Sequence, residues 1–430
     1  MKGRYLISIL FWSVISAAFI GPGTVTTAAK SGASFGTSLL WALGFSTIAC
    51  IFLQEAAARL NLATGAGLGA AIRKELGHPI WAYLTFLTIF SGGIAFQAGN
   101  MLGAVAGIEL LLPNSQLISV LLIGGIAFGM LWSGTPSNIA KWLGAIVGIM
   151  GVVFLLVVFS LPLAFSEVIR GAFIPSIPSG SESLVLGLIG TTIVPYNLFL
   201  GSELRNQSPL SVMRIGLATA VLIGGLISGA ILLVGTQISG DFSFAALAEV
   251  LSQSLGPWAR WFFALGLLIA GFTSSVTAPL ATALTARSLF QVEGKEDWES
   301  TSGKFKLIWG IVLIVGLGFG MSNVKPIPLI IIAQTLNGLL LPFITSLLVI
   351  LVNHPTLMPD QMRNGLWSNF ILLAINGVMC FLSLFKVWGI LAPESWVDAP
   401  SSQIGFVLLA VLIQAGLAWR IHQSKKRLAE

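Results

Sequence analysis

The stretch Gly21-Pro22-Gly23-Thr24 interrupts an apolar run from residue 6 to residue 31 near its middle. A second interruption, Val194-Pro195-Tyr196-Asn197, lies inside the apolar run from residue 183 to residue 205. Proline removes a backbone donor and glycine lowers helix propensity, so we expect neither helix to continue through its interruption. Paired breaks at corresponding places in two halves are typical of inverted-repeat transporters, whose substrate lies at mid-membrane.

The composition of the 430-residue chain is that of a membrane protein. Only 9% of its residues are charged and 56% are hydrophobic, and its mean hydropathy is +0.93, whereas about 25% of a soluble chain is charged. Twelve apolar stretches are long enough to cross about 30 Å of hydrocarbon. These predicted spans are residues 6–31, 37–60, 80–109, 117–133, 139–162, 183–205, 210–235, 256–290, 305–322, 327–352, 366–388 and 402–420.

We therefore expect an all-α, polytopic protein with one transmembrane domain over residues 1–430. Spans one to five, in residues 1–162, would form the first inverted repeat. Spans six to ten, in residues 183–352, would form the second. Two additional spans occupy residues 366–420. The amphipathic stretch 242–255 is expected to lie along a membrane interface.

Lysine and arginine are distributed unevenly over the loops that this topology creates. All but five of the 22 fall on the side of the N-terminus, the exceptions being Lys30, Arg170, Arg260, Lys325 and Lys386. Cytoplasmic loops of membrane proteins are enriched in these residues. We therefore expect both termini in the cytoplasm and the chain in the plasma membrane, which is the inner membrane if the source is bacterial.

Few charged residues lie inside the predicted spans. Glu55 precedes Arg59 by four residues near the cytoplasmic end of the second span, so the spacing predicts an ion pair on one helix face. The two cysteines, Cys50 and Cys380, lie in apolar runs and indicate no redox chemistry.

Several functional classes find no support in the sequence. It contains no Walker loop, no Ser-His-Asp spacing and no metal-hydrolase motif, so neither an ATP-driven pump nor an enzyme is indicated, and no cofactor is expected. Its basic residues form no stripe, which argues against nucleic-acid binding. The expected partners are membrane lipid and a small transported ion or solute, and we expect a monomer.

The sequence resembles a known family over spans one to ten. The stretch from Gly21 to Gly32, followed by Leu39-Leu40-Trp41 and the run from Leu53 to Leu60, is similar to the opening of the NRAMP family of proton-coupled Mn²⁺ and Fe²⁺ importers. The stretch from Val194 to Leu198 resembles the Met-Pro-His-Asn-Leu of that family's sixth span, and Ala333-Gln334 with Leu341-Pro342-Phe343 resembles its tenth. This resemblance implies a LeuT-like fold with broken helices 1 and 6, alternating access and a divalent metal ion as substrate.

The chain departs from the family at most residues that contact metal. By the resemblance, the family's metal-binding Asp corresponds to Gly21, its Asn to Thr24, its Met to Val194 and its His to Tyr196. Only Gln334 remains as a side-chain ligand. The remaining groups at this site are hydroxyls, amides and carbonyls, whereas Mn²⁺ and Fe²⁺ are selected over Mg²⁺ by softer ligands such as thioether and imidazole.

The family's proton route is also altered. Its third-span Asp aligns with Gln97 and the following Glu with Asn100. The three histidines, His78, His354 and His422, all fall in segments expected to be cytoplasmic. We therefore predict no high-affinity transition-metal site. The expected cargo is a largely hydrated divalent cation, Mg²⁺ or Mn²⁺, transported without the usual proton coupling.

The sequence also allows a substrate of a different class. The sequence Gly21-Pro22-Gly23 would expose backbone NH groups at the N-terminus of the outer half of the first helix, where the helix dipole favours an anion. The alternative is therefore a carrier of a small zwitterionic or anionic organic solute, such as an amino acid, with the metal site lost. Thr24, Tyr196 and Asn197 would then contact the rest of that ligand.

Three groups of candidate residues follow from these patterns. The predicted substrate-binding residues are Gly21, Thr24, Val194, Tyr196, Asn197 and Gln334, and the predicted hinge residues are Pro22, Gly23 and Pro195. Gln97, Asn100 and Asn337 are additional polar candidates inside spans, for which hydrogen bonding between helices is the other interpretation.

Overall fold

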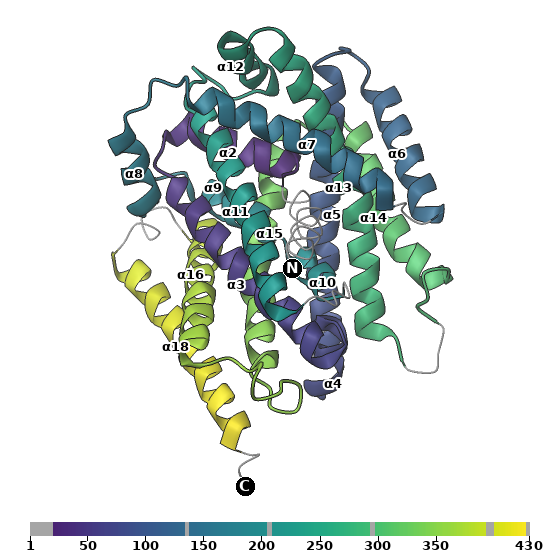
Figure 1. Ribbon diagram of the computed structural model, residues 1–430, viewed down its shortest axis with the longest axis vertical. Coiled ribbons are helices and arrows are strands. Elements are labelled where there is room, and N and C mark those ends of the chain that lie inside the picture. The colour runs from purple at the N-terminus through teal and green to yellow at the C-terminus, as the bar shows by residue number, and fades with distance from the viewer. Residues whose placement is uncertain (1–19, 134–136, 204–208, 293–296, 393–399, 427–430) are drawn as a thin grey trace.

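The fold was described from a computed structural model, in which residues 20–133, 137–203, 209–292, 297–392 and 400–426 are described (Figure 1). All regular elements in these residues are α-helices, which confirms the predicted all-α class. The helices are α2 (Pro22–Phe35), α3 (Leu40–Thr64), α4 (Leu68–Glu75), α5 (Ile80–Glu109), α6 (Gln116–Ser133), α7 (Ser137–Val158), α8 (Phe165–Phe173), α9 (Glu182–Thr192), α10 (Pro195–Glu203), α11 (Leu210–Gly235), α12 (Phe244–Leu255), α13 (Trp258–Phe290), α14 (Gly303–Met321), α15 (Pro326–Leu351), α16 (Leu366–Leu391) and α18 (Pro400–Lys426).

The described residues contain ten segments that are helical, long and apolar enough to cross a membrane. They correspond to ten of the twelve predicted spans, all except the first and the fifth. Of the first span, α2 is the C-terminal part, and residues 6–19 lie outside the described residues. The fifth span corresponds to α7, whose apolar stretch Ile146–Val158 is shorter than the other spans.

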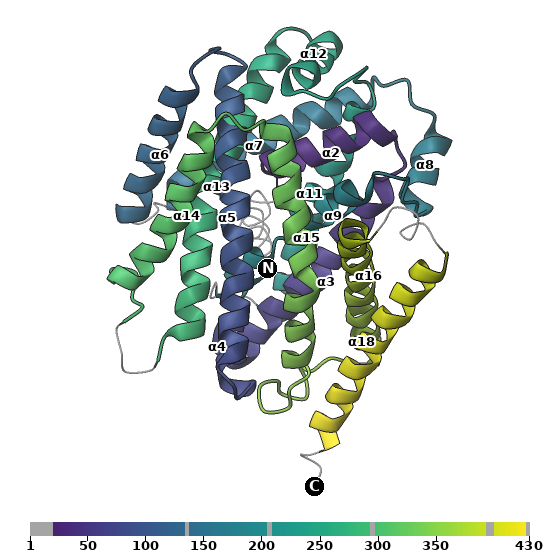
Figure 2. The same cartoon turned by 180° about the vertical axis from the view of Figure 1, so that it is seen from behind.

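Short helices lie at opposite ends of the bundle. Figure 1 shows α4 at the end that also holds the α15–α16 connection and the C-terminal end of α18, whereas α12 lies at the other end. Figure 2 shows the same arrangement from behind. The predicted interfacial stretch 242–255 forms α12, whose N-cap Ser243 accepts a hydrogen bond from the Ala246 amide. Which of the two ends faces the cytoplasm remains a prediction.

Small residues on α5 allow the central helices to approach closely. A Cβ placed on Gly107 would lie 2.5 Å from the Leu268 nitrogen of α13. One placed on Gly99 would lie 3.5 Å from Ile330 of α15, and one on Gly103 would lie 2.0 Å from Pro22 of α2. One face of α5, with glycines spaced by four, therefore packs against three helices, as expected for small residues between membrane helices.

The last two helices lie at the edge of the bundle. In both views α18 runs beside α16 on the periphery. Asn376 of α16 is fully buried and connects three helices, because it accepts a hydrogen bond from Thr345 of α15 and donates to Ser346 of α15 (3.0 Å) and Gln414 of α18 (3.2 Å).

An ion-pair network joins three elements at the end that holds α4. The predicted pair forms, with Arg59 Nε 3.0 Å from Glu55 Oε1. Arg59 is buried and also donates to the Asn364 side chain (2.6 Å), and Arg214 of α11 lies 2.8 Å from Glu55 Oε1. Buried charges need such partners, so this network holds α3, α11 and the connection before α16 together.

Candidate substrate site

The sixth predicted span is broken where the sequence indicated. α9 ends at Thr192, α10 begins at Pro195, and Ile193 leaves the helical region with φ −106° and ψ 83°. Pro195 has no NH to donate and disfavours helical geometry at Val194, which precedes it. Ile193 and Val194 are both buried. The backbone groups freed by the break therefore lie inside the protein.

The first predicted span has a helix start at its interruption. Pro22 is the first residue of α2, and Gly21 is its N-cap in extended geometry, with φ −103° and ψ −178°. Proline is favoured at the first position of a helix because its missing NH has no intrahelical partner there. Gly21 provides no side-chain cap. The structure therefore describes the interruption only from Ile20 onward, because residues 6–19 lie outside the described residues.

The two interruptions meet. The hydroxyls of Thr24 in α2 and Thr191 in α9 are 2.9 Å apart and hydrogen-bonded, although 167 residues separate them. Gln334 of α15 lies against the same point, since a Cβ placed on Gly23 would be 2.3 Å from its Nε2. Three helices from distant parts of the chain therefore converge on the stretch Gly21–Thr24.

Helices α5 and α13 form further walls around the breaks. Pro22 packs on Gly103 of α5, and a Cβ placed on Gly21 would lie 3.4 Å from Ser274 Oγ of α13. The Tyr196 ring meets Phe96 of α5 edge-on, with centroids 5.4 Å apart and an interplanar angle of 86°. Tyr196 is consequently buried, with only 2% of its surface exposed.

Two buried amides at the breaks have polar atoms without a protein partner. Neither Nδ2 nor Oδ1 of Asn197 makes a hydrogen bond within the described structure, and Oε1 of Gln334 also has none there. Both residues are almost fully buried, at 0% and 1% exposure. Buried polar atoms are ordinarily hydrogen-bonded. The two amide oxygens are therefore available to a substrate without breaking a protein contact.

The additional polar candidates face other helices. Gln97 Nε2 donates to the Ser275 carbonyl of α13 (3.2 Å), and its side chain packs on Gly316 of α14. The Asn337 amide oxygen packs on α5, because a Cβ placed on Gly92 would lie 2.7 Å from it. Gln97 thus forms a hydrogen bond between helices, which was the alternative to a role in substrate binding. Asn100 is buried on α5, and its Nδ2 has no partner within the described structure.

The sequence analysis did not select Ser274, which faces Gly21 from α13. Polar residues Thr273, Ser274 and Ser275 are consecutive within an otherwise apolar span. Three consecutive polar side chains point to different sides of a helix, so at least one must face the bundle interior. This run of polar residues could have indicated from the sequence that the eighth span contributes a residue to the site.

The chemistry of the site is that of neutral oxygen ligands. The described residues contain no group of three or more His, Cys, Asp or Glu that could hold a metal ion. The C-terminus of α9 brings its last backbone carbonyls and a partial negative charge to the breaks, which favours a cation. The N-terminus of α2 brings the opposite partial charge. Such a site suits a hard cation that keeps part of its water shell better than it suits a fully dehydrated transition metal.

Comparison with known sequences identifies related proteins. A family model described as natural resistance-associated macrophage protein-like matches residues 13–389. The divalent metal cation transporter MntH of Staphylococcus saprophyticus is 26% identical over 404 residues, which are 87% of this chain and 90% of that protein. MntH of Caldanaerobacter subterraneus is 23% identical over 398 residues, covering 86% of this chain and 92% of that protein.

Comparison with solved structures shows the fold. A crystal structure of the Eremococcus coleocola manganese transporter has a TM-score of 0.68 and 18% identity, and the match covers 98% of this chain and 96% of that one. The nucleobase-cation-symport-1 family transporter Mhp1 in a closed conformation has a TM-score of 0.54 and 17% identity, covering 97% of this chain and 93% of that one. Both similarities confirm the predicted transporter architecture with broken helices.

Proposed function

The chain belongs to the natural resistance-associated macrophage protein-like family, and from this premise we propose that it is a secondary transporter of a divalent metal cation. Its relatives are named divalent metal cation transporters. Alternating access around Gly21–Thr24 and Val194–Asn197 would move the ion, because these are the points at which two membrane helices can change direction. The protein would lie in the membrane with both termini cytoplasmic, as the distribution of lysine and arginine predicts.

The observation that carries this proposal is a pair of buried amide oxygens, Asn197 Oδ1 and Gln334 Oε1, which have no hydrogen-bond partner among the described residues. Amide oxygens are ligands of hard cations such as Mg²⁺ and Ca²⁺. With no carboxylate, thiolate or imidazole cluster in the described residues, these oxygens and the carbonyls at the end of α9 would supply the ligands. The ion would therefore be transported with much of its hydration shell, which favours Mg²⁺ or Mn²⁺.

Two other buried amides, Gln97 and Asn100, support transport without the usual proton coupling. A coupled proton needs a group inside the membrane that titrates near neutral pH, such as a carboxylate or an imidazole in a suitable environment. The positions that would carry protons in the family correspond to Gln97 and Asn100, and the structure packs both amides inside the bundle. Amide side chains do not exchange charge with protons at these pH values.

Ion influx into proteoliposomes tests the proposal. We expect Mn²⁺ or Mg²⁺ influx above that of protein-free vesicles, and no acidification of the vesicle lumen, reported by a trapped pH dye, during that influx. Flat traces for both ions would exclude the cation proposal. Influx accompanied by stoichiometric proton entry would leave cation transport standing and contradict the uncoupled mechanism.

Restoring a carboxylate at Gly21 is expected to create tighter divalent-ion binding. A Cβ at this position would make only ordinary van der Waals contact with Ser274, so the backbone there accepts a β-carbon. One added charged ligand strengthens binding because affinity for such ions rises with ligand charge. We expect a Mn²⁺ dissociation constant at least about tenfold lower by calorimetry. Gly21→Asn is the matched control, having the same shape without charge, and equal affinity of the two variants would contradict the proposed site geometry.

A carrier of a small zwitterionic or anionic solute is the second candidate. It is favoured by the N-terminus of α2, which has no side-chain cap and no acidic residue in its first turn, so that backbone NH groups face the break. A carboxylate-bearing substrate would stabilise the folded protein by binding to it. In a thermal-shift screen of amino acids and organic acids, the solute carrier should be stabilised by at least one compound. A cation transporter should be stabilised by none.

A further inference from the structure

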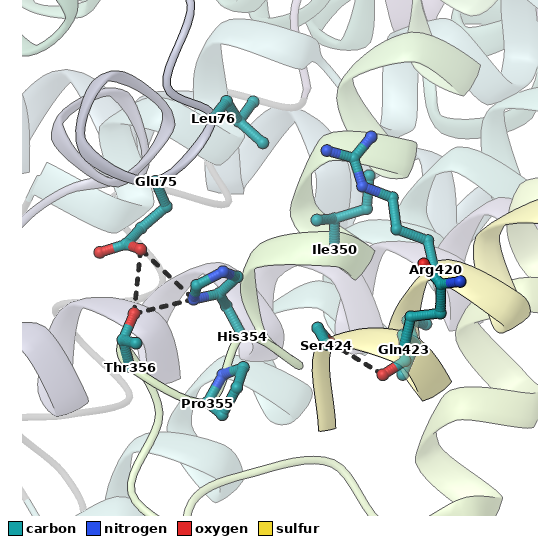
Figure 3. Close-up of a pocket in the computed structure, with 10 residues that line it drawn as sticks. Glu75, Leu76, Ile350, His354, Pro355, Thr356, Arg420, Gln423 and Ser424 are labelled. Carbon is teal, nitrogen blue, oxygen red and sulfur yellow. Dashed lines mark hydrogen bonds and ion pairs between the residues drawn. The ribbon is translucent and has the colours of Figure 1, made fainter. Parts of the chain in front are cut away.

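A polar cavity lies far from the helix breaks, at the end of the molecule that holds the C-terminal end of α18. Its volume is about 460 Å³. Glu75 of α4 and His354 and Thr356 of the α15–α16 connection line one side, and Arg420 of α18 lines the other. Figure 3 shows these two groups separated across the cavity, with Arg420 extending toward Ile350.

An apolar groove continues from this cavity toward the middle of the bundle. Its volume is about 350 Å³, and it shares Leu76, Ile350 and Arg420 with the polar cavity. Its other walls come from α5, α15, α16 and α18 and include Trp81, Pro342, Phe343, Leu347, Ile413 and Leu417. The ring of Trp81 stacks on that of Phe343, with centroids 6.4 Å apart.

The groove extends into the depth of the membrane. Its lining on α15 extends from Ile350 back to Pro342, a separation of eight residues. Its lining on α18 extends from Arg420 back to Ile413, a separation of seven residues. At 1.5 Å per residue these stretches correspond to about 10 to 12 Å along the helix axes. The groove opens beside α18, the most peripheral span, of which only 11% is buried in its most apolar window. Lipid chains therefore have direct access to it.

The charged groups at the mouth are not equivalent. The Glu75 carboxylate is engaged, because Oε2 accepts a hydrogen bond from Thr356 (2.9 Å) and lies 3.4 Å from His354 Nδ1. Arg420 is exposed and has no ion pair or side-chain hydrogen bond within the part of the chain that the structure describes. Among the described residues that line the mouth, Arg420 therefore offers a ligand a positive charge that no protein carboxylate engages.

We propose that this cavity and groove bind one acidic phospholipid from the leaflet at this end of the molecule, with its phosphate at Arg420 and an acyl chain in the groove. The occupant needs an anionic head, because Arg420 in the cavity lining has no ion pair among the described residues. It also needs an apolar chain, because the groove is lined mainly by apolar side chains. The chain would lie against α15 at Pro342, eight residues from Gln334 on the same helix. This inference does not depend on which substrate the protein transports.

Lipid binding to the purified protein tests the inference. Titration with phosphatidylglycerol and phosphatidylcholine, followed by native mass spectrometry, should show one phosphatidylglycerol retained in preference. Arg420→Gln should weaken that binding about fivefold, because one interfacial Lys or Arg contributes a correspondingly modest electrostatic attraction to an acidic lipid. Lys325→Gln is the matched control, since Lys325 is exposed at the opposite end of α15, and it should leave the affinity unchanged.

A second variant tests the groove itself. Leu417→Trp fills the groove and should weaken binding of phosphatidylglycerol without removing a charge. Equal affinity of the wild-type protein for both lipids would overturn the proposal, as would an equal loss in Lys325→Gln. Full competition by inorganic phosphate would show an anion site without a lipid chain, and a protein dimer that covers the groove would show a second copy as occupant; either result would also overturn it.

Discussion

Replacing Asn197 with alanine is expected to reduce divalent-cation influx by about 10- to 100-fold, the range over which supporting residues of a metal site affect its affinity. Asn197 is fully buried at the break between α9 and α10, and neither of its amide atoms has a protein partner in the described structure. Its removal therefore costs the fold no hydrogen bond. We expect the melting temperature of Asn197→Ala in detergent to be unchanged or higher, because burial of an unpaired amide is itself unfavourable.

Asn376 provides a matched control, because it is also a fully buried asparagine on a membrane helix. Its amide is satisfied by Thr345, Ser346 and Gln414. Asn376→Ala should destabilise the protein by about 1 to 3 kcal/mol, since it leaves buried partners unpaired. Influx per folded molecule should stay near the wild-type level. If Asn197→Ala lowered stability and Asn376→Ala did not, the assignment of Asn197 to the substrate would be wrong.

Gly190→Ala is expected to impair folding strongly. A Cβ at Gly190 of α9 would lie 2.2 Å from the carbonyl oxygen of Gln334 and 2.5 Å from the nitrogen of Gly338, both backbone atoms of α15. Backbone of a buried helix cannot move aside as a flexible side chain can, so the two helices must separate. Overpacking of this kind costs about 1 to 3 kcal/mol. We expect a clear fall in melting temperature and in the yield of monodisperse protein.

Gly224→Ala is the matched control for this effect. Gly224 is likewise buried within a membrane helix, α11, but a Cβ there would meet no atom within 4 Å. Alanine has the higher helix propensity, so Gly224→Ala should be neutral or stabilising. An equal fall in melting temperature in the two variants would show that the close approach of α9 and α15 is not the reason why position 190 requires glycine.

Separation of α9 from α15 should also affect transport. Gln334 contributes both the backbone atom that meets Gly190 and the side chain that lies against Gly23. A shift of α15 therefore displaces Gln334 Oε1 from the break. In the fraction of Gly190→Ala that folds, we expect reduced influx, measured per molecule of monodisperse protein.

The sequence was sufficient for the local features of the site. The break in the sixth span follows from Pro195, because a proline inside a helix removes a donor and restricts the residue before it whatever surrounds it. The helix start at Pro22 follows for the same reason. The neutral character of the site follows from residue identity alone, since no packing arrangement turns Gly21, Thr24, Val194 or Tyr196 into a carboxylate, thioether or imidazole.

The helix that each polar side chain contacts could be learned only from the packed structure. Gln334, a predicted substrate-binding residue, and Asn337, an additional polar candidate, are three residues apart on α15. The Gln334 side chain lies against Gly23 of α2, and the Asn337 side chain lies against Gly92 of α5. The Thr24–Thr191 hydrogen bond and the contribution of Ser274 were likewise hidden. Helix breaks are set by the covalent geometry of neighbouring residues, whereas these contacts join helices distant in the chain, and their rotation and spacing are set by how all the helices pack together.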